Sequence, residues 1–188
     1  MHILSFFLAI WALLDFDIES TASKLNNAYK YDDYEAFVDA FPTNFEDFLN
    51  LYGYDKFEGG RILYYDSCKH IQYLFSERRI IDSNRLDLLI NLSYGFKWGV
   101  DASSCLQDES QRLVKNYPQN IAEWLILKKD SDIISFFRMC LTELIKDYST
   151  DLYNTFIKEY SPISPRITKL IKAAYVLALE DSNKIVVE

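Results

Sequence analysis

Apolar residues recur at helical spacing along most of the chain. Phe45, Phe48, Leu49 and Tyr52, for example, stand at positions i, i+3, i+4 and i+7, which places them on one face of a helix. The stretch 131–147 has the widest apolar face, which is typical of a helix in the centre of a bundle. We therefore predict an all-α, single-domain fold, either an orthogonal bundle or stacked helical hairpins of about eight to nine short helices.

Proline, capping residues and glycine mark the expected helix boundaries. Pro42 ends one helix, and the spacing of Thr43–Glu46 predicts a capping box at the start of the next. Gly53 is the expected left-handed residue at the end of that helix. Ser164 and Pro165 are expected at the N-cap and first position of the last helix.

The longest irregular segment is expected to follow Gly53, over residues 54–66. Long loops in compact domains are often functional, and Tyr and Arg are enriched among the hot spots of protein interfaces. The candidate binding residues of this segment are Tyr54, Asp55, Phe57, Arg61, Tyr64 and Tyr65. The alternative is a connection whose tyrosines pack on the core.

The turn 96–101 is a second candidate. Trp98 is either a hot spot for a ligand or a buried side chain that locks two helices together. Asp101 is the expected N-cap of the following helix and a candidate acidic site residue.

The chain is acidic, with a formal net charge of −8. Nucleic acids and anionic lipid surfaces bind basic proteins, so neither is an expected partner. A basic protein partner fits this charge, and so does ordinary solvation of an acidic surface. Nothing in the sequence selects an oligomeric state.

The N-terminus has the pattern of a secretory signal peptide. Residues 3–14 are uncharged and apolar, too short to span a membrane as a helix but long enough for the core of such a peptide. Small residues at Ser20 and Ala22 predict cleavage after Ala22, which leaves residues 23–188 as one helical domain in the periplasm or outside the cell, with no membrane span. Alternatively, residues 3–14 remain as a core helix of a cytoplasmic protein.

Cysteine and histidine are too few and too widely spaced for a metal site, and no motif indicates a cofactor. Buried free thiols are the default expectation for Cys68, Cys105 and Cys140, with one disulfide plus a leftover thiol as the alternative. His70 is expected at the surface or half-buried. Since its spacing from Cys68 puts the two on different helix faces, no catalytic dyad is predicted, and the chain is interpreted as non-enzymatic.

Two blocks of this sequence resemble those of an uncharacterised group of small exported proteins from Bacteroidota. The segment 41–55 resembles the block FPxxFxxFxxxFGYD, and the segment 97–102 resembles the block KWxADA. The chain departs from the second block at Gly99 and Val100, and it lacks the lipobox cysteine of many members. The resemblance implies a helical fold and export, and it implies no activity.

The favoured hypothesis is a non-enzymatic protein-interaction module of the cell envelope. An immunity-type inhibitor, which occludes a basic toxin, is its most concrete form, because the chain is acidic, rich in aromatic residues and without catalytic motifs. The alternative is a carbohydrate-binding or carbohydrate-active domain. It would use Trp98, Tyr64 and Tyr65 as stacking platforms, together with Asp55 or Asp101.

Overall fold

The computed structural model describes residues 16–76, 83–98, 102–143 and 146–185. Within these ranges the chain is all-α apart from one two-stranded hairpin, which confirms the predicted fold class. The helices are α1 (Ile18–Lys30), α2 (Tyr34–Ala40), α3 (Phe45–Tyr52), α4 (Ser67–Leu74), α5 (Ser83–Ser93), α6 (Ala102–Asn116), α7 (Pro118–Leu125), α8 (Asp130–Leu141), α9 (Lys146–Tyr160) and α10 (Pro165–Ile185). Between α3 and α4 lie β1 (Tyr54–Asp55), β2 (Gly59–Gly60) and the 3-10 helix η1 (Tyr64–Asp66).

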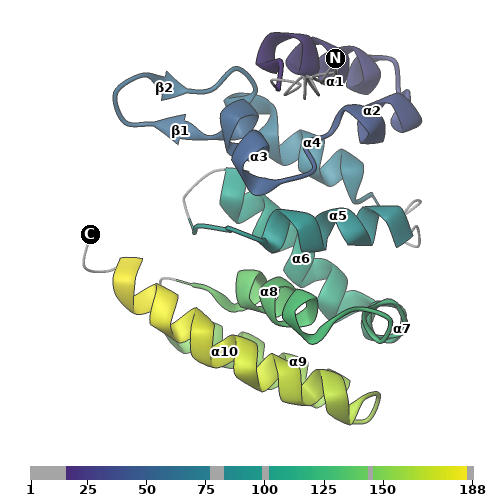
Figure 1. The fold of residues 1–188 in the computed structure, drawn as a ribbon, viewed down its shortest axis with the longest axis vertical. Coiled ribbons are helices and arrows are strands. Elements are labelled where there is room, and N and C mark those ends of the chain that lie inside the picture. Colours follow the sequence, from purple (N-terminus) through teal and green to yellow (C-terminus); the bar gives the residue numbers. More distant parts are fainter. Residues whose placement is uncertain (1–15, 77–82, 99–101, 144–145, 186–188) are drawn as a thin grey trace, which may run out of the picture.

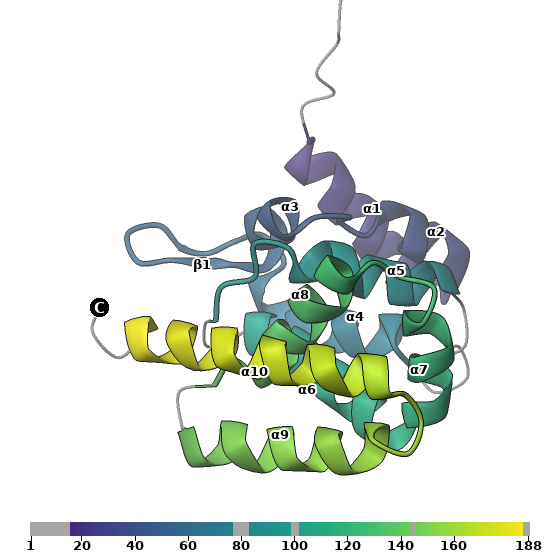
Figure 2. The same ribbon diagram turned by 60° about the horizontal axis from the view of Figure 1, so that its bottom comes forward.

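The helices follow the order of the chain along the long axis of the molecule, from α1 and α2 at one end to α9 and α10 at the other (Figure 1). Consecutive helices pack as pairs at both ends, and between them α4 contacts α6 while α8 contacts both α5 and α10. Buried side chains from α1 to α10 join into one hydrophobic cluster. The β1–β2 hairpin projects from the side of this stack in both views (Figures 1 and 2).

Helix α3 begins one residue later than predicted. Its N-cap is Asn44, whose Oδ1 accepts the backbone N–H of Asp47 at 2.9 Å, so Thr43 does not cap it. Gly53 follows the helix as expected, but its φ of −74° is extended rather than left-handed. Glycine is required there for a different reason, because a Cβ on Gly53 would lie 2.5 Å from the carbonyl oxygen of Leu49.

The helix predicted over 131–147 ends earlier, at Leu141, and α9, expected to start at Ser149, already begins at Lys146. The chain leaves the helical conformation at Thr142, and side chains from α6 bind the last carbonyl groups of α8. The buried Gln107 amide donates to the Thr142 carbonyl, and the buried Gln111 amide donates to the Cys140 carbonyl at 2.9 Å. These donors satisfy backbone acceptors that a helix end leaves without intrahelical partners.

Helix α10 begins as predicted. Ser164 Oγ accepts the backbone N–H of Ile167 at 3.3 Å, and Pro165 is the first helical residue. With 21 residues, α10 is longer than the other helices of the described ranges. Even so, no helix in these ranges combines the length and the apolar character needed to cross a membrane.

The predicted cleavage point lies inside α1. Asp17 caps this helix by accepting the N–H of Ser20 at 3.0 Å, and Ala22 is buried in the core. The apolar run at residues 3–14 lies outside the described residues, so the signal peptide stays a prediction.

Candidate functional site

The segment 54–66, expected to be irregular, forms an antiparallel β-hairpin followed by a 3-10 turn. Its short strands pair Tyr54 with Gly60 and Asp55 with Gly59. Residues 64–66 form η1, which leads directly into α4. The candidate residues of this segment are therefore displayed on a regular element.

The tip of the hairpin is held by the side chain of Asp55. Its Oδ1 accepts the backbone N–H groups of Phe57 at 2.8 Å and Glu58 at 3.0 Å, and these two bonds lower the pKa of the Asp55 carboxyl. Gly59 has a φ of +87°, a conformation that suits glycine. Arg61 forms an ion pair with Glu58 at 2.8 Å. Local hydrogen bonds thus fix the tip of the hairpin.

The base of the hairpin is tied to α3. The backbone N–H of Arg61 donates to the carbonyl of Gly53 at 2.9 Å, and that of Leu63 donates to the carbonyl of Leu51 at 2.9 Å. Leu63 itself is buried in the core. The hairpin is therefore anchored at its base and fixed at its tip.

Large apolar side chains cover the outside of this element. The exposed fraction is 92% for Tyr65, 86% for Phe57, 61% for Tyr54 and 57% for Ile62. Tyr64 links two of them, with its ring centroid 5.4 Å from that of Tyr54 and 5.0 Å from that of Tyr65. We call these five residues the hairpin face. Among the side chains from 54 to 65, Leu63 is the one buried in the core. The alternative, a connection whose tyrosines pack on the core, is therefore not what the structure has.

Gly60 sets the position of Tyr64. A Cβ on Gly60 would lie 2.6 Å from Cγ of Tyr64 and 2.7 Å from its Cδ1. The ring of Tyr64 can therefore lie against β2 because residue 60 has no side chain.

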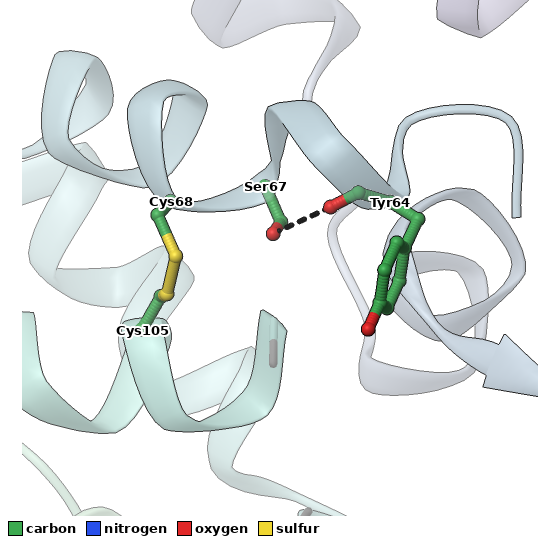
Figure 3. The surroundings of a disulfide bond; sticks show 4 residues. All are labelled: Tyr64, Ser67, Cys68 and Cys105. Atoms are coloured by element: carbon green, nitrogen blue, oxygen red, sulfur yellow. Dashed lines mark hydrogen bonds between the residues drawn. A yellow bond between two sulfur atoms is a disulfide. The ribbon is translucent and has the colours of Figure 1, made fainter. Parts of the chain in front are cut away.

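A disulfide lies close to the C-terminal end of the segment 54–66. It joins Cys68 in the first turn of α4 to Cys105 in α6, with a Cα–Cα distance of 5.3 Å (Figure 3). Beside it, Ser67 Oγ donates to the Tyr64 carbonyl at 2.8 Å, so η1 is joined to the stapled helix. The default expectation of three free thiols is wrong for this pair, and the alternative of one disulfide with a leftover thiol holds. The leftover Cys140 is buried, and burial raises the pKa of its thiol.

His70 is fully buried, so the prediction of a surface or half-buried position is wrong. Its ring is packed among aromatic side chains, with centroids 5.0 Å from Tyr29 and 5.2 Å from Phe37. Nδ1 lies 3.1 Å from the hydroxyl oxygen of Tyr52, and Nε2 has no hydrogen-bond partner among the described residues. Loss of solvation lowers the pKa of His70 to about 4, so the ring is neutral at pH 7 and contributes to the core.

Trp98 does not join the hairpin face. It is half-buried in a groove of about 880 Å³ between the end of α5, α8 and α10. The lining of this groove includes Tyr94, Phe96, Lys97, Trp98, Arg138 and Asp181, and none of the hairpin tyrosines. Arg138 donates to both carboxylate oxygens of Asp181, at 2.6 and 2.7 Å. Asp101 lies outside the described residues.

The candidate residues thus fall into two sites: Tyr54, Asp55, Phe57, Arg61, Tyr64 and Tyr65 lie on the hairpin and the η1 turn that follows it, and Trp98 lies in the groove. Within the described ranges, no three His, Cys, Asp or Glu side chains are grouped as metal ligands. The sequence did carry a signal for the hairpin. Asp55 followed by Gly59 has the spacing of a short turn with a left-handed glycine before the second strand.

Comparisons of this chain with protein-family models, with curated proteins and with solved structures found no match.

Proposed function

We propose that this chain is a non-enzymatic protein-interaction module and that the hairpin face is its binding surface. The observation that carries the proposal is the exposure of Tyr54, Phe57, Ile62 and Tyr65 on one small element. Exposed apolar side chains that gather in a patch mark interaction sites in soluble proteins, and aromatic anchors supply much of the binding energy at interfaces.

The fixed backbone of the hairpin supports this proposal. The Asp55 turn, the ladder to α3 and the Ser67 hydrogen bond all act on the segment that displays the aromatic rings. A surface that is ordered before binding loses less conformational entropy when a partner docks. The same exposed side chains would be costly on a segment with no partner to cover them.

We place the module in an oxidising compartment. Structural disulfides persist in the periplasm and outside the cell and are rare in the cytoplasm, so the Cys68–Cys105 bond supports export through a signal peptide over residues 1–22. An unreduced intact mass of the protein from its native host should begin at Ser23 and lack the two thiol hydrogens of this pair. A mass that begins at Met1 with three free thiols would favour a cytoplasmic protein.

The most concrete form of the proposal is an immunity-type inhibitor of a toxin. A rigid aromatic surface without catalytic groups can occlude an active site, and the net charge of −8 would attract a basic enzyme. The segment 54–66 carries three acidic side chains, Asp55, Glu58 and Asp66, and two basic ones, Lys56 and Arg61, so its net charge is only −1. This segment therefore contributes aromatic contacts to binding, and any preference for a basic partner arises elsewhere on the molecule.

Truncation of the hairpin face should abolish tight binding. A photo-crosslinking residue at position 65 would capture the partner in the native host, with the same residue at position 127 as the control site. Once the partner is purified, we expect Phe57→Ala and Tyr65→Ala each to weaken binding by about 30-fold, the loss typical of an interface hot spot.

Leu127→Ala is the matched control for these variants, because Leu127 is 83% exposed in the turn after α7 and does not belong to the segment 54–66. It should change the affinity by less than about twofold, as most surface truncations do. Equal losses in all three variants would exclude the hairpin face as the binding surface.

A second candidate function is carbohydrate binding, and one observation favours it. The groove at Trp98 combines aromatic rings with an ordered Arg138–Asp181 pair, the mixture of stacking and polar groups that small-molecule sites use. This site differs from the one predicted, because Tyr64 and Tyr65 lie in η1 and do not line the groove. If the chain binds glycans in a glycan array, Trp98→Ala should remove the signal and Tyr65→Ala should leave it intact.

A further inference from the structure

The negative charge of the chain is concentrated in its first three helices. Residues 16–50 carry eight acidic and two basic side chains, a net charge of −6 out of −8 for the whole chain. The concentration persists if residues 1–22 are removed, because residues 23–50 then carry −4 out of −5. A charge so unevenly placed produces a strong local field on one end of the molecule.

This acidic end contains a groove. It has a volume of about 690 Å³ and lies between α1, α2 and the turn that leads into α3. Its apolar lining includes Phe16, Tyr31, Ala36, Ala40, Phe41 and Pro42. Small alanine side chains on facing helices leave room for side chains of another molecule.

Three carboxylates line the same groove. Asp33 and Asp39 come from the start and end of α2, and Asp47 comes from α3, whereas Lys24 is the one basic residue among the lining residues. Asp39 is exposed on α2. The groove therefore joins an apolar floor to a rim of negative charge.

We propose that this groove binds a cationic amphipathic segment of a partner protein. The apolar side chains of that segment would fill the space beside Ala36 and Ala40. Its Lys or Arg side chains would face Asp33, Asp39 and Asp47. Amphipathic helices commonly dock in this way, with apolar anchors in a groove and charges at its rim that set orientation and specificity. The groove and the hairpin face lie on different elements, so variants that test one surface leave the other unchanged.

The test uses a synthetic probe and the purified protein with its disulfide intact. The probe is a peptide of about 14 residues, about four helical turns, with Leu at helical spacing and Lys elsewhere. A second peptide with Glu in place of Lys is the control probe. Binding is measured by fluorescence anisotropy at roughly 0.05 and 0.3 M salt, and amide hydrogen exchange locates the bound peptide.

We expect the Lys peptide to bind, the Glu peptide not to bind, and protection from exchange to appear in α1 and α2. Asp39→Lys should weaken binding by about tenfold or more, because it reverses a charge at the rim. Asp151→Lys makes the same change of net charge at an exposed position of α9. It should change binding by less than about twofold, because charges far from the groove are screened by salt. Ala36→Trp, which fills the groove from an exposed position, should weaken binding without a change of charge.

Any one of three results would overturn the proposal. Equal effects of Asp39→Lys and Asp151→Lys would show that the peptide responds to net charge alone. Protection outside α1 and α2, or unchanged affinity in Ala36→Trp, would show that the groove is not occupied. Circular dichroism of each variant establishes that it is folded before binding is compared.

Discussion

Removal of the Cys68–Cys105 disulfide is expected to lower the free energy of unfolding by about 4 kcal/mol. The two cysteines are 37 residues apart, and the chain-entropy model gives about this value for a closed loop of that length. The bond joins α4 to α6, so its loss removes a covalent cross-link between the first four helices and the rest of the stack.

Urea denaturation of the wild type and of the double variant Cys68→Ala/Cys105→Ala measures this loss. Reductant should destabilise the wild type by a similar amount and leave the double variant unchanged, because the remaining thiol, Cys140, is already free. A difference below about 1 kcal/mol would mean that the unfolded chain is not restricted as the loop-entropy model assumes.

Acid is expected to destabilise the protein through His70 before most carboxylates are protonated. The pKa of His70 is lowered to about 4 by burial, whereas an unfolded histidine titrates near 6.5. Between these two values the unfolded state binds the proton and the folded state does not. The contribution of His70 to the free energy of unfolding is therefore fully present above about pH 6.5. It is lost as the pH falls towards 4, by about 3 kcal/mol in total.

The variant His70→Gln separates this effect from the titration of carboxylates. It lacks the ionisable ring but retains a side chain that can hydrogen-bond to Tyr52. Unfolding free energies of both proteins at pH 7.5, 6.0, 5.0 and 4.5 should converge as the pH falls, with the variant less stable at pH 7.5. Parallel curves would show that His70 titrates normally in the folded protein.

The apolar spacing of the sequence was sufficient to predict the fold class, because each helix carries its own periodic stripe. It placed the end of α8 several residues too late, at 147 instead of Leu141. The end of α8 is bound by Gln107 and Gln111, which lie on α6 and whose contacts exist only after the helices pack. The position of His70 was missed for the same reason, since its burial comes from rings on α1, α2 and α3.

The candidate site could be predicted in part. The tyrosine-rich segment was identified from composition, and its exposure depends on Leu63 being the side chain that turns inward, which no local spacing specifies. The pairing of Cys68 with Cys105 likewise could not be chosen from three cysteines. Trp98 was grouped with Tyr64 and Tyr65 because all three are aromatic. In the fold it lines a groove that neither tyrosine reaches.

The location of Ala22 sets an order of events for any cleavage at the Ala22–Ser23 bond. In folded α1, Ala22 is buried and its neighbours take part in helical hydrogen bonds, such as the 2.9 Å bond from the Thr21 N–H to the Asp17 carbonyl. Proteases act on exposed backbone, so the bond can be cut only before α1 docks or during an excursion that undocks it. If the chain is exported, cleavage after Ala22 would therefore compete kinetically with the docking of α1. Any substitution that speeds the docking of α1 would increase the fraction of unprocessed protein.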